Sequence, residues 1–308
     1  MKLRSFFRIV EIKTKIVSVS TFSIAVLYGF YRNGEVDLGI LPLMFAAVLF
    51  VDMGTTAFNI FFDYWKGVDH QDYQREEEKV LVYENVPPYV AFLIGAGLFF
   101  GAVVFGAVVS LLTSLYVAFF GAVCMGVGYF YTAGPYPISR SPFGELFAGG
   151  FLGTVLFLIT YYVVSGHRYG PSPVDLETIA ASGPSFFLIA SILTVNNTCD
   201  ILGDAAAGRK TLSIVLGKKR AELLIYLLGF LGFVSALLLS FHGVFPRLSL
   251  IPLVLAAIAA GLEYRKMHQR GFNQETKAPS MGSISKIFLL YTGAMWISLI
   301  GAQLYGVS

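Results

Sequence analysis

Acidic residues at the ends of two long apolar segments are the groups in this chain best suited to chemistry. Each segment ends in an asparagine followed four residues later by an aspartate: Asn59 and Asp63 in the first half, Asn196 and Asp200 in the second. An ionised carboxylate near the core of a lipid bilayer is costly unless it is paired or hydrated, so such a residue indicates a functional site. The recurrence of the pattern in both halves predicts one shared polar site.

Helical spacing places the polar residues of each motif on one face, because residues four apart lie on the same side of a helix. Lys66 extends the first stripe, and Asp204 belongs to the second. Carboxylate and amide oxygens are hard ligands, and Mg²⁺ is commonly held by one or two carboxylates together with substrate phosphate oxygens. Two facing stripes could therefore hold Mg²⁺ against a diphosphate, with Lys66, Arg209 and Lys210 neutralising remaining charge. Such a diphosphate is a good leaving group, because the charge that develops on it is stabilised.

A purely structural role is the main alternative for either motif alone, since Asn-x-x-x-Asp at a helix end is usually a solvated terminus. Two such motifs in matching positions on one side of the membrane disfavour that reading. Asp52 lies seven residues before Asn59 and shares its face, either supporting the motif or lining a cavity. The acidic run of Asp72 and residues 76–78 is expected to be solvated.

The composition identifies an integral membrane protein. Apolar residues make up 56% of the 308 positions, and mean hydropathy is +0.70. Charged residues make up 13%, against about 25% in soluble domains. A hydrocarbon core of about 30 Å needs about 20 residues per helix. The sequence therefore predicts an all-α polytopic fold with nine spans around a central cavity, in one domain over residues 1–308, with residues 1–13 as an interfacial N-terminal segment. The predicted spans are 14–31, 39–63, 89–112, 114–132, 143–165, 177–200, 220–241, 247–264 and 286–306.

The distribution of positive charge predicts the orientation of these spans. With the N-terminus in the cytoplasm, 19 of the 22 Lys and Arg residues fall in cytoplasmic segments, as the positive-inside rule requires. Both acidic motifs and their loops then face the cytoplasm. The same bias accounts for the net charge of +3, so the charge does not indicate binding to nucleic acid.

Several motifs resemble those of the UbiA superfamily of intramembrane prenyltransferases. The run DAAAGRKTLSIVLG at 204–217 is similar to the continuation of that family's second motif. Four further features resemble the menaquinone branch of that family in particular. They are YTAGPYP at 131–137, PFGEL at 142–146, the tyrosine pair 161–162 and the spacing of polar residues over 59–69. The resemblance covers residues from about 50 to 220.

This resemblance implies a nine-helix protein in which two acidic motifs bind Mg²⁺ and a polyprenyl diphosphate. It implies a reaction in which the diphosphate ionises and an electron-rich ring carbon attacks the allyl cation. In the menaquinone branch the acceptor is 1,4-dihydroxy-2-naphthoate, which loses its carboxylate. The protein is then expected in the plasma membrane of a prokaryote.

The resemblance also assigns roles to residues of this sequence. The expected metal ligands are Asn59, Asp63, Asp200 and Asp204. The three aspartates are also the expected catalytic acids, together with Asp69, which would assist deprotonation. The expected substrate contacts are Asn59, Lys66, Asn196, Asn197, Arg209 and Lys210 around the diphosphate, and Tyr131, Glu145 and Tyr162 on the acceptor side.

Two departures from the family pattern leave the acceptor open. Ile60 stands where the family commonly has an acid directly after the asparagine. Residues 70–79 are acidic where the menaquinone branch usually has a glycine-rich loop ending in a basic residue. The alternatives are a prenyltransferase for another acceptor, a relative that binds prenyl lipids without turnover, and an ion-coupled transporter, since paired intramembrane acids also mark ion pathways. A transporter would more commonly place its acids near the middle of the membrane.

Overall fold

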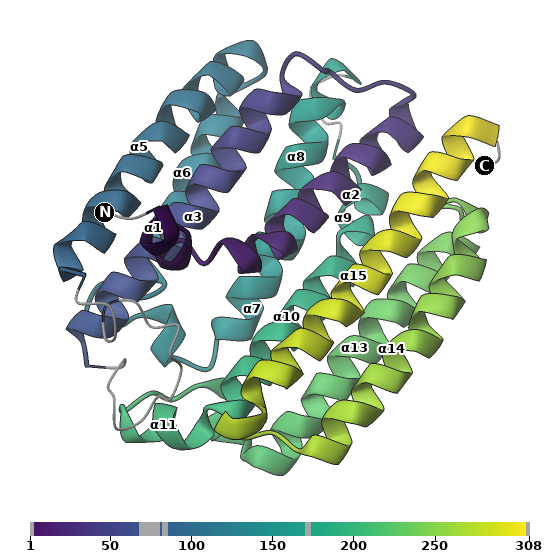
Figure 1. The fold of residues 1–308 in the computed structure, drawn as a ribbon. Coiled ribbons are helices and arrows are strands. Elements are labelled where there is room, and N and C mark those ends of the chain that lie inside the picture. The colour runs from purple at the N-terminus through teal and green to yellow at the C-terminus, as the bar shows by residue number, and fades with distance from the viewer. Residues whose placement is uncertain (1–2, 68–80, 82–85, 170–173, 306–308) are drawn as a thin grey trace.

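The chain is an all-helical bundle in a computed structural model that describes residues 3–67, 81, 86–169 and 174–305 (Figure 1). Eight helical segments in the described residues are long and apolar enough to cross a membrane. The predicted span 114–132 corresponds to a shorter apolar helix, α6, of 16 residues. The spans are α2 (Ile16–Asn33), α3 (Leu41–Trp65), α5 (Pro88–Leu112), α6 (Leu115–Phe130), the run of α7 (Gly144–Ala148), η3 (Gly149–Val155) and α8 (Leu156–Val164), α9 (Leu176–Ala181) with α10 (Gly183–Cys199), α13 (Lys218–Phe241), η5 (Arg247–Ser249) with α14 (Leu250–Arg270), and α15 (Gln274–Tyr305).

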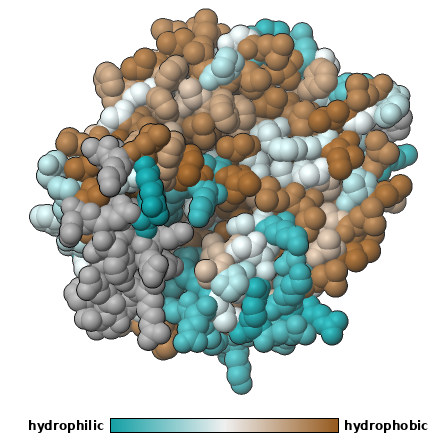
Figure 2. Space-filling view, viewed as in Figure 1, coloured by the Kyte–Doolittle hydropathy of each residue, from teal (hydrophilic) through white to brown (hydrophobic). Residues whose placement is uncertain are grey.

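The prediction of an all-α membrane protein is confirmed, and its surface fits a bilayer. Hydrophobic residues cover most of the upper part of the molecule, whereas hydrophilic residues gather at its lower end (Figure 2). Large apolar side chains such as Phe100, Leu111 and Phe230 point outward with more than half of their surface exposed. Buried serine and threonine hydroxyls of the spans mostly donate to carbonyls of their own helices, as Thr194 and Ser298 do, so they meet the demand of lipid for internal hydrogen bonds.

The helices form two groups that meet around the centre (Figure 1). On one side α3 packs mainly against α5 and α6, and on the other α10 packs against α13, η3 and α15. The helices α2 and α8 contact each other between these groups. Helices α3 and α10 end, and α15 begins, at the same end of the bundle, which we call the motif end because it carries both acidic motifs.

Glycines allow α3 and α5 to approach closely. A Cβ atom added at Gly54 of α3 would lie 2.5 Å from Cδ1 of Phe99, and one at Gly101 of α5 would lie 2.6 Å from Cδ2 of Phe50. An aromatic ring of the facing helix therefore packs directly against each glycine. Small residues at such interfaces are how membrane helices gain packing contacts without a hydrophobic driving force.

The last span is longer than predicted. The helix α15 begins at Gln274, whereas hydropathy placed the start of the span at residue 286. The added turns are too polar for a hydropathy criterion, yet one face of them lines the central cavity. The cavity-lining residues of α15 recur at helical spacing: Gln274, Lys277, Ala278, Met281, Gly282, Ser285 and Leu289.

The N-terminal segment, predicted to be interfacial, packs on the bundle. It forms α1 (Leu3–Ile9) and η1 (Ile12–Lys15), and α1 lies across α3 (Figure 1). Ile9 is fully buried in a small apolar cluster with Ala57 and Ile60 of α3 and Ala91 of α5. Several of its other residues line the central cavity.

The π-helical stretch η3 gives a prediction about packing. A Cβ atom added at Gly153 would lie 2.7 Å from both the N and Cα atoms of Phe186 in α10, and backbone cannot move aside as a side chain can. Gly153→Ala is therefore expected to destabilise the protein by about 1–3 kcal/mol, the usual cost of overpacking. Thermal unfolding in detergent would measure this as a lower melting temperature.

Gly150→Ala is the matched control, because a Cβ atom there meets nothing within 4 Å. Its melting temperature should equal or slightly exceed that of the unaltered protein, since alanine favours helix over glycine. Equal melting temperatures for the two variants would contradict the close contact of η3 with α10.

Candidate active site

A cavity of about 1650 Å³ opens between the two helix groups. Its polar part lies at the motif end, where Asn59, Asp63, Asp200 and Arg209 line it. Farther along, its walls are mostly aliphatic and aromatic; they include Val109, Val117, Phe147, Phe151, Leu156 and Ile189. One cavity thus joins a charged end to an apolar interior, which suits an amphiphilic ligand with an anionic head.

Arg209 links the two acidic motifs. Its Nη2 atom lies 2.9 Å from Oδ1 of Asp63, and its Nη1 atom lies 3.2 Å from Oδ1 of Asp204. The guanidinium is 12% exposed and the Asp204 side chain 3% exposed. The predicted convergence of the two motifs is therefore present in the structure, with a cation between them.

A turn in the chain delivers Arg209 to this position. The helix α10 ends at Cys199, Asp200 stands at the junction, and α11 (Ile201–Ala206) follows with Asp204 on its inner side. Gly208 has a φ of 72°, a conformation that glycine adopts without strain. The chain then reverses so that the Arg209 N–H donates to the Asp204 carbonyl over 2.9 Å.

Asp204 is the most enclosed of the motif carboxylates. Burial raises its pKa to about 6; Arg209 opposes the shift and Asp200 adds to it. Its Oδ2 atom is buried and has no hydrogen-bond partner. A buried carboxylate oxygen without a partner is unusual in a folded protein, so this atom is suited to receive a cation or a donor from a ligand.

Asp200 has a partner that the sequence did not reveal. The Nζ atom of Lys277, in the first turns of α15, donates to Oδ2 of Asp200 over 2.7 Å. Lys277 was missed because it lies in the polar stretch before the hydropathy-defined span. The small and apolar residues Ala278, Met281, Gly282, Ser285 and Leu289 recur at helical spacing after Lys277 in the sequence, which is the signal that could have identified it.

Asn59 and Lys66 are held by the segment after α6. The Thr132 hydroxyl donates to Oδ1 of Asn59 over 2.9 Å. The Lys66 ammonium donates to the carbonyls of Thr132 and Gly134 over 2.6 and 2.8 Å. Burial and the nearby Arg140 lower the pKa of Lys66, and Asp63 partly offsets this. Lys66 therefore fixes the end of α3 against the 132–134 segment beside the site.

Asn196 and Asn197 of α10, Glu145 of α7 and Tyr131 at the end of α6 come from three different elements. Asn196, Asn197 and Tyr131 line the cavity. The Nδ2 atom of Asn197 donates to Oε1 of Glu145 over 2.8 Å. Glu145 is 4% exposed, and its Oε2 atom is buried without a partner. These four residues are brought together, and Glu145 retains an oxygen able to accept a proton or hydrogen bond.

Three predicted residues are not part of this group. Tyr162 stands near the far end of α8, beside His167; the helical run from Gly144 separates it from Glu145 by about 25 Å at 1.5 Å per residue. The Lys210 side chain is exposed, and only its backbone N–H is fixed, by the Arg140 carbonyl. Asp69 lies outside the described residues, as does the whole acidic stretch 70–79.

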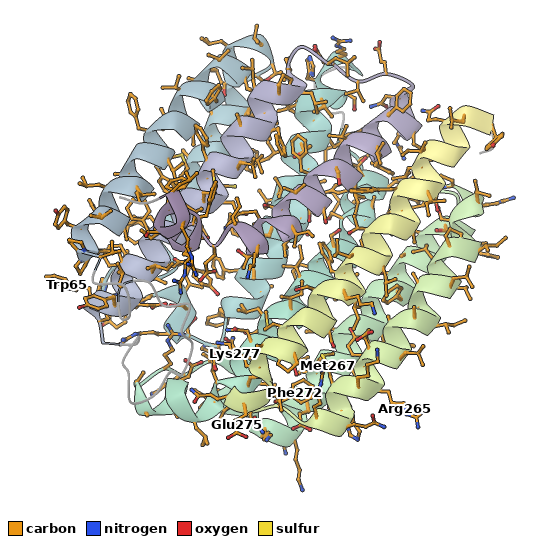
Figure 3. All side chains as sticks on the ribbon, in the orientation of Figure 1. Trp65, Arg265, Met267, Phe272, Glu275 and Lys277 are labelled. Atoms are coloured by element: carbon orange, nitrogen blue, oxygen red, sulfur yellow. The ribbon has the colours of Figure 1, made fainter. Side chains whose placement is uncertain are left out.

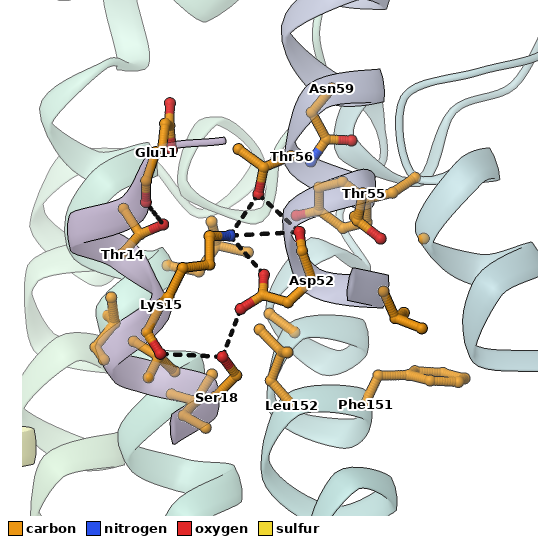
Figure 4. Close-up of a pocket in the computed structure, with 18 of the residues that line it drawn as sticks. Glu11, Thr14, Lys15, Ser18, Asp52, Thr55, Thr56, Asn59, Phe151 and Leu152 are labelled. Carbon is orange, nitrogen blue, oxygen red and sulfur yellow. Dashed lines mark hydrogen bonds and ion pairs between the residues drawn. The ribbon is translucent and has the colours of Figure 1, made fainter. Parts of the chain in front are cut away.

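Asp52 lines the cavity and is paired with the N-terminal segment (Figure 4). The Lys15 ammonium lies 2.6 Å from Oδ1 of Asp52 and 2.7 Å from the Thr56 hydroxyl. The Ser18 hydroxyl donates to the second Asp52 oxygen. Both sequence alternatives for Asp52 are thus partly met: it faces the cavity, and it carries a structural ion pair one turn from Thr56 and two turns from Asn59.

The departure at Ile60 has a packing explanation. Ile60 is 8% exposed and belongs to the apolar cluster with Ile9 of the N-terminal segment. A carboxylate at this position would lie against the apolar side chains of Ile9, Ala57 and Ala91, which offer it no hydrogen bond. An apolar residue here therefore suits the way in which α1 covers α3.

The donor set fits a hard divalent cation. Three carboxylates and one amide oxygen converge on the motif end, and the Asp204 Oδ2 atom has no partner. Such oxygens are the ligands that Mg²⁺ prefers. In the part of the chain that the structure describes, no three acidic, histidine or cysteine side chains form a ready metal cluster, which agrees with Arg209 and Lys277 lying among the carboxylates.

Two curated proteins are similar to this chain in sequence. A 1,4-dihydroxy-2-naphthoate octaprenyltransferase of Bacillus subtilis is 31% identical over 62% of this chain and 59% of its own length. A protein of the same name from Mycobacterium tuberculosis is 34% identical over 39% of each chain. This chain therefore covers less than two thirds of either relative.

Solved structures share the fold. A structure described as digeranylgeranylglyceryl phosphate synthase covers 97% of this chain and 99% of its own, with a TM-score of 0.67 and 18% identity. A UbiA homologue from Archaeoglobus fulgidus, bound to GPP and Mg²⁺, covers 94% of this chain and 99% of its own, with a TM-score of 0.65 and 18% identity. The model of the UbiA prenyltransferase family matches residues 19–299. The chain belongs to the UbiA prenyltransferase family.

Proposed function

We propose that this protein transfers a polyprenyl group from its diphosphate to 1,4-dihydroxy-2-naphthoate in an Mg²⁺-dependent reaction. The observation that carries the proposal is the cluster of carboxylates and cations at one end of a large apolar cavity. A polyprenyl diphosphate has a matching division between charged head and apolar tail. The acids lie at the ends of α3 and α10, which suits a head group better than an ion path through the membrane.

The diphosphate head binds among Asn59, Asp63, Asp200, Asp204 and Arg209. The oxygens of the first four are the proposed Mg²⁺ ligands, and bound Mg²⁺ would stabilise the charge that develops on the departing diphosphate. Arg209 supplies N–H donors from a rigid fork that suits phosphate oxygens. The A. fulgidus homologue bound to GPP and Mg²⁺ supports this assignment through its shared fold.

The apolar walls protect the allyl cation. Phe147 and Phe151 line the cavity, with stacked rings whose centroids are 5.8 Å apart. Aromatic faces attract cations, and a site without water prevents the cation from being captured by hydrolysis. Phe147 and Phe151 thus stabilise the cation and hold the tail in place.

The acceptor side consists of Tyr131, Glu145 and Asn197. Tyr131 and Asn197 face the cavity, and Glu145 has the free oxygen that an acceptor hydroxyl needs to be oriented or deprotonated. Asp69 remains a candidate for the same deprotonation. The names of the B. subtilis and M. tuberculosis relatives support a naphthoate as acceptor, as do the motifs at 131–137 and 142–146.

The charge distribution supports a cytoplasmic position for the site. The motif end carries most of the Lys and Arg residues, which the positive-inside rule assigns to the cytoplasm. We therefore place the site on the cytoplasmic face of a prokaryotic plasma membrane, where charged diphosphate and naphthoate would reach it.

Removal of one motif carboxylate is expected to stop the reaction. Asp63→Asn and Asp200→Asn should each lower the prenyl transfer rate roughly a hundredfold or more, the scale on which loss of one transition-state charge partner acts. Product formation by purified protein in lipid vesicles would measure the rates.

Asp37→Asn is the control for these variants. Asp37 lies at the opposite end of the bundle, where it pairs with Arg168, so its loss should leave the rate within a few-fold of the unaltered protein. Near-normal rates in both the Asp63 and Asp200 variants would contradict the proposed metal site.

Removal of divalent metal is expected to abolish transfer reversibly. Treatment with EDTA should reduce product formation to background, and excess Mg²⁺ should restore it, because the carboxylates alone repel a diphosphate. The membrane protein should remain folded throughout, as its melting temperature would show. Transfer at an unchanged rate after chelation would argue against metal assistance.

An acceptor panel tests the choice of substrate. Purified protein with Mg²⁺ and a polyprenyl diphosphate should convert 1,4-dihydroxy-2-naphthoate to a prenylated naphthalenediol that has lost the carboxylate, detected by mass spectrometry. Other aromatic acids, such as 4-hydroxybenzoate, should give little product. Product formed only with another acceptor would overturn the naphthoate assignment while leaving prenyl transfer intact.

A further inference from the structure

Every motif carboxylate in the described residues already has a cationic partner. Asp63 and Asp204 share Arg209, and Asp200 pairs with Lys277 at 2.7 Å. The Lys277 side chain is 15% exposed and that of Asp200 11%. The ion pairs are therefore largely withdrawn from solvent, where charges interact strongly.

These pairs oppose the binding of a metal by itself. A metal that takes Oδ2 of Asp200 must displace the Lys277 ammonium, and the two cations repel each other. Breaking an ion pair that is largely withdrawn from solvent is costly, so the displacement of the ammonium from Asp200 opposes metal binding. The metal-free arrangement thus favours Lys277 over a metal at this oxygen.

A bound diphosphate would remove this obstacle to metal binding, because its anionic oxygens offer the Lys277 ammonium a new partner. Lys277 lines the same cavity as Asp200 and Asn196, so its ammonium can turn toward a ligand there without movement of the backbone. Lysine is suited to this change, since it is a point charge on a flexible stem. Figure 3 shows Lys277 near the start of α15, on the side toward α7 and α10, whereas Arg265 points outward from α14.

We propose that Lys277 is an exchangeable counter-ion of the site: it neutralises Asp200 in the empty site and transfers to a diphosphate oxygen when metal and diphosphate bind together. This inference rests on the proposed function and adds a residue that the family motifs do not include. Its consequence is positive coupling, in which diphosphate strengthens metal binding and metal strengthens diphosphate binding by the same factor.

The test measures binding, with Mn²⁺ as a spectroscopic substitute for Mg²⁺. Free Mn²⁺ is quantified by electron paramagnetic resonance during titration of purified protein with Mn²⁺ alone. Binding of the Mn²⁺ complex of inorganic diphosphate is measured separately, by equilibrium dialysis with radiolabelled diphosphate. Lys277→Gln should bind Mn²⁺ alone more tightly and its diphosphate complex more weakly, each by about tenfold, within the usual range of coupling between two sites.

Two further variants separate this role from a structural one. Lys277→Arg keeps the charge and holds a carboxylate with two donors, so it should bind Mn²⁺ alone no more tightly than the unaltered protein. Lys286→Gln is the matched control on the same helix, because Lys286 pairs with Glu263 outside the cavity. It should leave both affinities unchanged.

Several outcomes would overturn the inference. The exchange is rejected if Lys277→Gln binds Mn²⁺ alone no more tightly than the unaltered protein. It is also rejected if Lys277→Arg shows the tighter binding expected only of the glutamine variant. If the unaltered protein binds neither Mn²⁺ nor its diphosphate complex, the proposed metal site itself fails, which is a different result from loss of coupling at a working site.

Discussion

The pairing of charge inside a membrane bundle is the constraint on which this structure depends. Isolated ions are expensive in hydrocarbon, and four aspartates at or beside the cavity are each paired with a cation. Asp52 pairs with Lys15, Asp200 with Lys277, and the pair Asp63 and Asp204 with Arg209. Three of these ion pairs join segments that are distant in the sequence, and the fourth, between Asp204 and Arg209, closes a local turn. Charge pairing therefore holds together the same elements that form the site.

The Arg209 bridge has the largest structural consequence. Asp63 ends a helix that packs with α5 and α6, while Asp204 follows a helix that packs with α13 and α15. A single guanidinium thus connects the two helix groups at the motif end. The short helix α11 and the turn at Gly208 reverse the chain, so that Arg209 lies beside Asp204. Loss of the bridge would leave carboxylates of both groups facing each other across the cavity.

The sequence predicted the spans because hydropathy is a local property. Eight membrane-length segments and the shorter α6 correspond to the nine predicted spans, and the first motif and second motif meet as their spacing indicated. Prediction failed where tertiary contacts decide a helix boundary. The first turns of α15 are polar, and they become helical against the cavity, which carries Lys277 to Asp200. Tyr162 was grouped with the acceptor residues by its motif, but a continuous helical run carries it to the far end.

The same constraint explains why a site of this kind stands at the end of a bundle. At mid-span, three carboxylates would need permanent partners, and permanent partners would exclude a metal and an anionic ligand. Near the membrane–water interface, Arg209 and Lys277 can exchange a carboxylate partner for a ligand oxygen. The net charge of the site then changes little. Lys66 supports this arrangement differently, because its ammonium is fixed by the carbonyls of Thr132 and Gly134 rather than by a motif acid. The site thus contains two kinds of cation. Lys66 is bonded to backbone carbonyls and fixes helix α3, whereas Arg209 and Lys277 are paired with carboxylates and can respond to the charge of a ligand.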